Sequence, residues 1–147
     1  AVFNYPIFIL KKELLKIPIF GWHLKKIGSI SINRDKISKE NLGFYDKIVS
    51  TTIKTKRPVI IFPQATRTNI NEKIPFKKGV SKIYEKLNFI CVPVALNSGI
   101  VWPKSGNLSS NKTIIISILD YIPIGLTAED FLKKIEENLY NEADKIT

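Results

Sequence analysis

A short apolar run in this sequence is followed directly by hydroxyl, guanidinium and ammonium groups. The run 58–62 (PVIIF) is typical of a buried strand, and Thr66, Arg67, Lys77 and Lys78 come between it and Gly79. A guanidinium can hold two oxygens of one phosphate, a hydroxyl adds a donor, and a helix opening at Gly79 would favour an anion at its N-terminus. These residues predict a phosphate site at the strand end, although a solvated basic loop would have the same composition.

Arginine is rare among the basic residues, since the 23 Lys and Arg residues include only Arg34, Arg57 and Arg67. In a chain so rich in Lys, each Arg invites a geometric explanation. Arg34 ends the alternating run 29–33 (SISIN), and Arg67 follows PVIIF. We therefore expect two neighbouring strand ends to direct two guanidinium groups at one phosphate dianion, an arrangement that chance could also produce. Arg67→Ala should therefore weaken binding of a phosphorylated substrate and reduce turnover, whereas Arg57→Ala should have little effect on either.

Strands and helices alternate along the chain, which predicts an α/β fold. The expected strands cover 5–10, 29–33, 58–62, 90–96 and 113–119, and the expected helices cover 19–27, 38–55, 80–87 and the segment after the cap Thr127. In such sheets, ligands bind where loops leave the carboxyl ends of the strands. Because no repeat, linker or break in composition is present, residues 1–147 are expected to form a single domain.

Composition excludes several classes of protein. A chain of 147 residues that is 44% hydrophobic can bury a core, which excludes a disordered scaffold. One Cys and one His cannot build a disulfide or a tetrahedral zinc site, so no metal is expected. The longest uncharged stretch, 87–103, is too short and too interrupted to span a bilayer.

Positive charge is concentrated in residues 1–90, which hold 18 basic and 6 acidic side chains, a net charge of +12. Such a surface suits nucleic acid, anionic lipid or a phosphorylated small molecule. The segment 11–26 mixes lysines with aliphatic and aromatic residues, as a membrane interface requires, but a helix packed on the sheet would show the same pattern. His23 lacks a sequence neighbour that would orient it as a base, and Cys91 is expected in the core.

Five stretches together resemble the lysophosphatidic acid acyltransferase family, which acylates 1-acylglycerol 3-phosphate to phosphatidic acid. In chain order they are KKELLKIPIFGW (11–22), GSISINR (28–34), FPQATR (62–67), FKKG (76–79) and ICVPVAL (90–96). The resemblance implies a mixed, mostly parallel central sheet flanked by helices. It also implies a metal-free and cofactor-free reaction, in which the acceptor hydroxyl attacks the thioester of acyl-CoA or acyl carrier protein.

The resemblance carries roles over to particular residues. It implies that the acceptor phosphate is bound by Arg34, Arg67 and Lys11. The loop around that phosphate would be shaped by Gln64, Ala65 and Thr66, and Pro93 would belong to the acyl-site block. The implied partners are lysophosphatidic acid, the acyl thioester and an anionic membrane at the cytoplasmic face of the cell's inner membrane. No nucleic acid is expected, because the aromatic residues fall mainly in apolar runs.

Three departures from the family pattern lead to further expectations. The catalytic H-x-x-x-x-D motif should precede Lys11, yet the ten residues there include no His, so the chain is expected to be an N-terminally truncated domain that is inactive alone. Gln64 stands where the family has Glu, and Ala65 where it has Gly; because a Cβ disfavours positive φ, we expect Ala65 at φ < 0. Glycerol 3-phosphate or another lysophospholipid could replace the acceptor, and a non-enzymatic membrane- or nucleic-acid-binding domain is the alternative outside enzymes.

Overall fold

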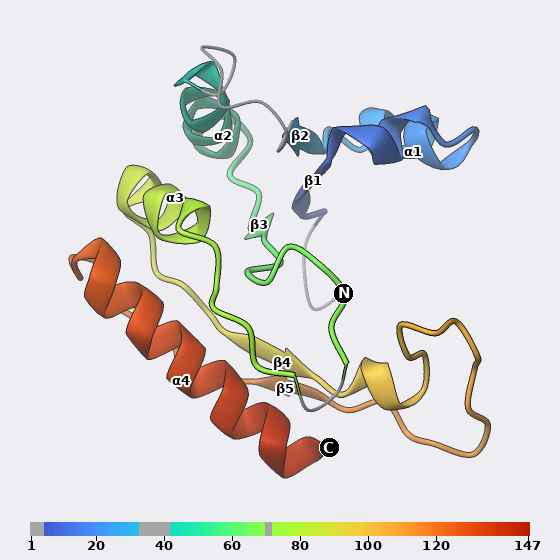
Figure 1. Cartoon of the computed structure of the whole chain (residues 1–147). Coiled ribbons are helices and arrows are strands. Elements are labelled where there is room, and N and C mark those ends of the chain that lie inside the picture. The colour runs from blue at the N-terminus through green and yellow to red at the C-terminus, as the bar shows by residue number, and fades with distance from the viewer. Residues whose placement is uncertain (1–4, 33–41, 70–71) are drawn as a thin grey trace. The chain divides into compact units, whose positions relative to one another are not determined.

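The computed structural model describes residues 5–32, 42–69 and 72–147, and it contains two compact units (Figure 1). The first unit is Ala1–Phe62 and the second is Pro63–Thr147. Each unit has its own sheet, its own helices and its own buried side chains, so each is described by itself.

The first unit is built on a parallel sheet with the strand order β2–β1–β3. β1 (Ile7–Lys11) pairs with β2 (Ile30–Ile32) and with β3 (Val59–Ile60), both in parallel. Parallel strands need crossover connections. The 3-10 helix η1 (Lys12–Lys16) and helix α1 (Phe20–Lys26) lead from β1 to β2, and α2 (Leu42–Thr55) leads into β3.

The core of the first unit explains its elements. Ile7, Ile9 and Leu10 are all buried, so β1 is covered on both faces, as is typical of the central strand of a parallel sheet. Helix α2 buries Phe44 and Ile48, which are four residues apart and therefore share one helix face.

The second unit combines two helices with an antiparallel strand pair. In chain order its elements are α3 (Gly79–Leu87), β4 (Val94–Leu96), the 3-10 helix η3 (Ser98–Ile100), β5 (Ile116–Ile118) and α4 (Ala128–Ile146). Thr127 caps α4 as the sequence predicts, because its side chain accepts a hydrogen bond from the Asp130 N–H at 3.1 Å. Helix α4 packs on α3 through Phe131, whose ring stacks on Tyr84 at a centroid distance of 3.9 Å.

The predicted α/β class, with a parallel sheet and helices, is confirmed, but the strands are shorter than their apolar runs suggest. Only Val59–Ile60 of PVIIF pairs as a strand, and Phe62 is 57% exposed. Ile116 and Ile118 of β5 are also exposed, because a two-stranded ribbon with α4 on one face leaves alternate side chains uncovered. The predicted strand end at Arg34 and the start of the helix predicted over 38–55 lie outside the described residues.

Candidate phosphate-binding site

The phosphate loop, defined here as residues 63–78, begins directly after the first unit and ends at the start of α3. Its two ends meet, because the Lys77 N–H donates to the Pro63 oxygen at 3.0 Å. Lys77 and Lys78 are exposed, and Gly79 begins α3 as predicted. The structure therefore brings the Pro63 end of the loop to the backbone of Lys77, next to the exposed Lys78 and the start of α3, and this arrangement suits an anion.

Arg67 lies exposed on this loop and is held by a turn further along the chain. Its Nη2 donates to the backbone oxygens of Trp102 at 3.1 Å and of Pro103 at 2.9 Å. Its Cζ also lies 5.5 Å from the centroid of the Trp102 ring, within the range of a cation–π contact. Thr66, the predicted hydroxyl donor, is exposed beside it.

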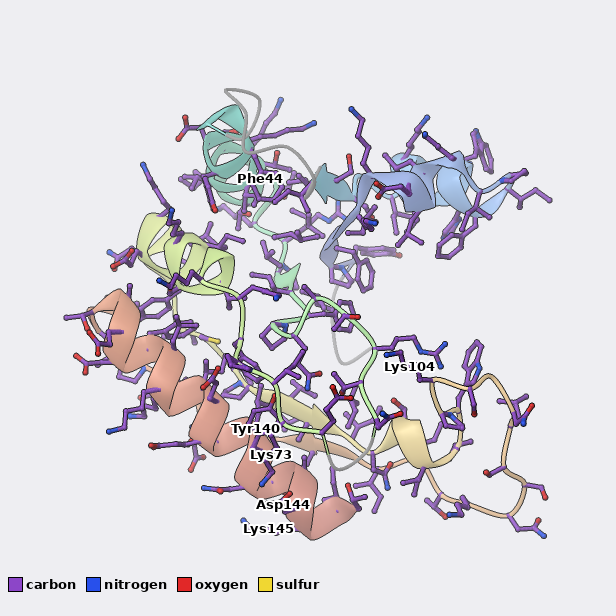
Figure 2. The ribbon with its side chains drawn as sticks, in the orientation of Figure 1. Phe44, Lys73, Lys104, Tyr140, Asp144 and Lys145 are labelled. Carbon is purple, nitrogen blue, oxygen red and sulfur yellow. The ribbon has the colours of Figure 1, made fainter. Side chains whose placement is uncertain are left out.

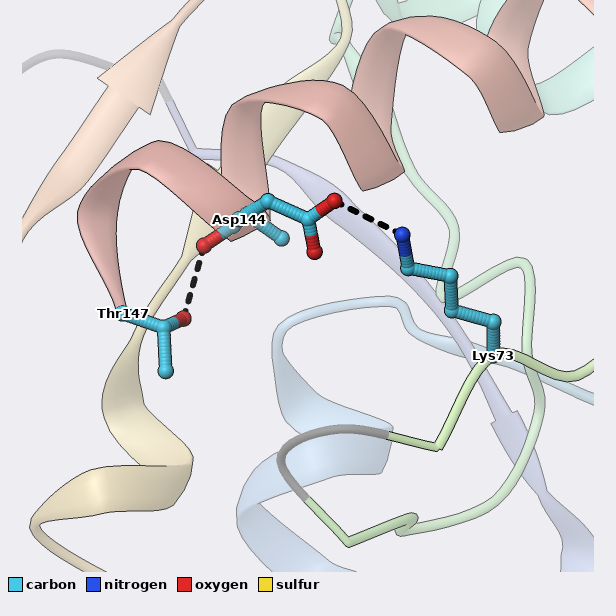
Figure 3. A network of polar contacts seen from close by, with 4 residues as sticks. Lys73, Asp144 and Thr147 are labelled. Carbon is cyan, nitrogen blue, oxygen red and sulfur yellow. Dashed lines mark hydrogen bonds and ion pairs between the residues drawn. The ribbon is translucent and has the colours of Figure 1, made fainter.

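Helix α4 holds the other half of the phosphate loop through three residues spaced four apart. The carboxylate of Glu136 accepts a hydrogen bond from the Phe76 N–H, and Asp144 Oδ2 lies 2.7 Å from Lys73 Nζ (Figure 3). Between them, Tyr140 lies next to Lys73 against the loop (Figure 2). Sequence reasoning missed this face of α4, although the spacing of the three polar residues placed them on one side of a helix.

Gln64 is half-buried, and its amide is directed at α4. Gln64 Nε2 donates to the Tyr140 hydroxyl at 3.3 Å. The same hydroxyl accepts from the Ile74 N–H at 3.0 Å and donates to the Ile74 oxygen at 2.5 Å. Gln64 thus makes a contact that a carboxylate could make only as an acceptor, and its role in shaping a phosphate-binding loop stays a prediction.

The expectation for Ala65 was wrong, because this residue has φ +60°. The left-handed conformation crowds a Cβ against the backbone, which is why glycine usually occupies it. The loop therefore keeps the conformation suited to glycine and holds an alanine in it. Such strain persists only where surrounding contacts enforce it, and the α4 contacts to Gln64 and Ile74 lie on both sides of this residue in the chain.

The remaining predicted phosphate ligands belong to the first unit. Lys11 is exposed at the end of β1, where its Nζ lies 3.8 Å from Glu13 Oε1. Arg34 lies outside the described residues. It therefore stays a prediction that one phosphate is bound by Arg34, Lys11 and Arg67 together. Pro93, of the acyl-site block, is fully buried just before β4, and its oxygen accepts from the Leu119 N–H at 3.0 Å.

Arg57 has a structural place that the sequence did not reveal. Its guanidinium donates to the backbone oxygens of Tyr5, of Pro6 at 3.1 Å and of Ile27 at 2.7 Å. These contacts tie the start of β1 to the end of α1. The small effect of Arg57→Ala on acceptor binding and turnover stays a prediction, but removal of Arg57 would leave three carbonyl oxygens without this donor, so we expect a loss of stability.

The single His and the single Cys lie in different surroundings. His23 is exposed on α1. Cys91 is half-buried, and this burial raises the pKa of its thiol to about 11, so it is almost wholly protonated near neutral pH. Across the described ranges, no cluster of three or more His, Cys, Asp or Glu residues is positioned to hold a metal ion.

Comparison with known proteins identifies the class. The family model described as Acyltransferase matches residues 2–97, so the chain belongs to the acyltransferase family. The 1-acyl-sn-glycerol-3-phosphate acyltransferase of Pseudomonas aeruginosa is 33% identical over 112 residues, 75% of this chain and 42% of that protein. The Helicobacter pylori protein of the same name is 31% identical over 137 residues, 91% of this chain and 56% of that protein. The chain thus spans about half the length of these curated relatives.

A solved structure shows the same fold. The crystal structure of the 1-acyl-sn-glycerophosphate (LPA) acyltransferase PlsC from Thermotoga maritima superposes with a TM-score of 0.77 at 22% identity. The match covers 97% of this chain and 57% of that one. In the part of the chain that the structure describes, none of the helices combines the length and the apolar character needed to cross a bilayer.

Proposed function

We propose that the whole protein transfers a fatty acyl group from acyl-CoA or acyl carrier protein to the free hydroxyl of 1-acylglycerol 3-phosphate, giving phosphatidic acid. The observation that carries this proposal is Arg67, held on a phosphate loop whose ends meet beside two lysines, in a chain that belongs to the acyltransferase family. The relatives named for this reaction support the choice of acceptor.

The proposed division of labour follows from charge. A phosphomonoester carries close to two negative charges near neutral pH, so it favours several cationic donors over one. Arg67, Arg34 and Lys11 bind the phosphate, while Thr66 adds a hydroxyl donor. Gln64 and Ala65 set the shape of the loop, and Pro93 belongs to the acyl site.

The proposed reaction is direct and needs neither metal nor cofactor. The acceptor hydroxyl loses its proton to a general base and attacks the thioester carbonyl, and the thiol of the donor leaves. His23 is not assigned as that base, because Gly28 stands where an H-x-x-x-x-D motif would require Asp. We propose that the base is the His of such a motif, oriented by its Asp.

The proposal also places the protein on an anionic membrane at the cytoplasmic face of the cell's inner membrane. Helix α1 buries only Gly21 and Leu24, so the alternative of a helix packed on the sheet fits few of its apolar residues. Ile19 is 84% exposed and Trp22 64% exposed. Exposed lysines lie close to them in the chain, at positions 16, 25 and 26. Exposed apolar side chains with a lysine border suit lipid head groups.

An acceptor panel tests the reaction. The protein encoded by the full open reading frame is supplied with acyl-CoA or acyl carrier protein and with 1-acylglycerol 3-phosphate, glycerol 3-phosphate or lysophosphatidylcholine. We expect transfer to 1-acylglycerol 3-phosphate. Preference for glycerol 3-phosphate would keep the fold and change the acceptor, whereas a stable protein that acylates none of them would favour a non-enzymatic membrane-binding role.

Vesicle binding tests the membrane assignment separately. Co-sedimentation with phosphatidylglycerol vesicles should fall when Trp22 is replaced by Ser, while the matched change of the exposed Tyr121 to Ser should leave it unchanged. Equal binding by both variants would contradict the assignment of this face.

A further inference from the structure

The guanidinium of Arg67 is exposed, yet the backbone and side chain of a single turn restrain it. Both hydrogen bonds from Nη2 end on that turn, at the Trp102 and Pro103 oxygens, and the Trp102 ring lies against Cζ. An unrestrained arginine loses much rotamer freedom when it closes on a ligand. The contacts with the turn remove part of this rotamer freedom before any ligand binds.

The turn itself has a fixed base. The Trp102 N–H donates to the Ser98 oxygen at 2.8 Å. Ser98 follows Asn97, which is only 4% exposed. The Asn97 side chain accepts from the Ile115 N–H at 2.6 Å and donates to the Ile146 oxygen at 2.9 Å. Because a buried side chain anchors the turn to α4 and to the residue before β5, the turn can hold Arg67 in one orientation.

The contacts also leave donors for a ligand. An arginine carries N–H groups on Nε, Nη1 and Nη2. Within the described residues, the hydrogen bonds of Arg67 use Nη2 alone, so the hydrogens on Nε and Nη1 remain for phosphate oxygens. We propose that Trp102 is a positioning residue, whose ring and carbonyl hold the Arg67 guanidinium ready for the acceptor phosphate. This inference rests on the proposed function.

The role predicts which kinetic constant changes. The phosphate does not react, so Arg67 binds it equally in the ground state and in the transition state. Loss of positioning should therefore raise the KM for the acceptor and leave kcat nearly unchanged. Because exposed cation–π contacts are weak, we expect Trp102→Ala to raise this KM about twofold to fivefold.

The experiment uses the full open reading frame with acyl thioester and 1-acylglycerol 3-phosphate. It compares Trp102→Ala with Trp102→Phe, which keeps an aromatic face and should restore most of the affinity. Lys104→Ala is the matched control, since it removes an exposed cation from the same turn and should change nothing. In an Arg67→Ala background, Trp102→Ala should have no further effect, because Trp102 acts through Arg67.

A second readout separates this inference from the proposed function. Replacement by Phe of every Trp other than Trp102, including Trp22, leaves Trp102 as the fluorescent reporter. Glycerol 3-phosphate, but not glycerol, should shift the Trp102 emission, and Arg67→Ala should abolish the shift. A shift without acyl transfer to any acceptor would overturn the proposed function and uphold the positioning of Arg67 at an anion site.

Two results would overturn the inference while the function stands. One is normal acyl transfer that depends on Arg67 but has the same acceptor KM in Trp102→Ala. The other is a lower KM in Trp102→Ala, which would mean that the turn competes with the phosphate for Arg67.

Discussion

The hydroxyl of Tyr140 on α4 closes a reciprocal pair of hydrogen bonds with the backbone of Ile74. It accepts from the Ile74 N–H at 3.0 Å and donates to the Ile74 oxygen at 2.5 Å. It also receives the Gln64 amide at 3.3 Å, so one phenol satisfies polar groups on both arms of the phosphate loop. The C-terminal helix therefore sets the conformation of a loop far from it in sequence.

Tyr140→Phe should lower the free energy of unfolding by about 1–3 kcal/mol, because it leaves the part-buried Ile74 N–H without its partner. Urea denaturation measures the change. Tyr121→Phe is the matched control, since Tyr121 is 62% exposed and should tolerate loss of its hydroxyl. Equal stability of the two variants would show that the Tyr140 contacts contribute nothing net.

Ala65→Gly should stabilise the protein by about 0.5–1 kcal/mol, because glycine relieves the left-handed strain but gains freedom in the unfolded chain. The same substitution at Ala143, inside α4, should instead destabilise it by about 1 kcal/mol. Thermal unfolding of both variants checks the opposite signs. A loss of stability on Ala65→Gly would mean that the packing of the methyl group contributes more free energy than the left-handed backbone costs.

The sequence predicted those features of the fold that depend on local pattern. Thr127 caps α4 because a hydroxyl three residues before Asp130 is a local signal. Gly28 has φ +76° and follows the C-cap Ile27 of α1, as its place after a helical run predicts. The α/β class followed from alternation of such elements.

Local sequence pattern could not predict the contacts between segments that lie far apart in the chain. The three carbonyl partners of Arg57 and the contacts of α4 with the phosphate loop join residues 30 to 76 positions apart. The left-handed Ala65 also escaped prediction, because a rule for isolated residues favours φ < 0 and tertiary contacts outweigh it here.

Arg57→Ala should lower the free energy of unfolding by about 1–3 kcal/mol, since a charged donor to three backbone oxygens is removed. Lys54→Ala, which removes an exposed cation from the end of α2, should stay within about 0.5 kcal/mol of the wild type. The midpoint of urea unfolding distinguishes the two. If Arg57→Ala unfolds at the same urea concentration as the wild type, the contacts that tie β1 to α1 contribute nothing to stability.

Cys91 should react slowly and with a displaced pH profile. Burial raises the pKa of its thiol to about 11, so at pH 8 its alkylation by iodoacetamide should be at least about 100-fold slower than that of a free thiol, with a rate still rising at pH 10. Urea-unfolded protein is the control and should react at the ordinary rate. A native rate that levels off near pH 9 would contradict the raised pKa.

The same shift links stability to pH. The native thiol keeps a proton that the unfolded chain releases above its ordinary pKa, so the stabilising contribution is complete below that pKa. It is lost as the pH rises toward about 11. In Cys91→Ala, the free energy of unfolding should lack this part of its decrease at alkaline pH.

The KM of the full-length protein for 1-acylglycerol 3-phosphate, compared between wild type and Arg67→Ala, tests most directly whether this loop binds the acceptor phosphate. Loss of a charge-assisted pair should raise that KM about tenfold or more, and leave kcat and the KM for the acyl thioester nearly unchanged. An Arg67→Ala enzyme with the wild-type acceptor KM would contradict the assignment of the phosphate site to this loop.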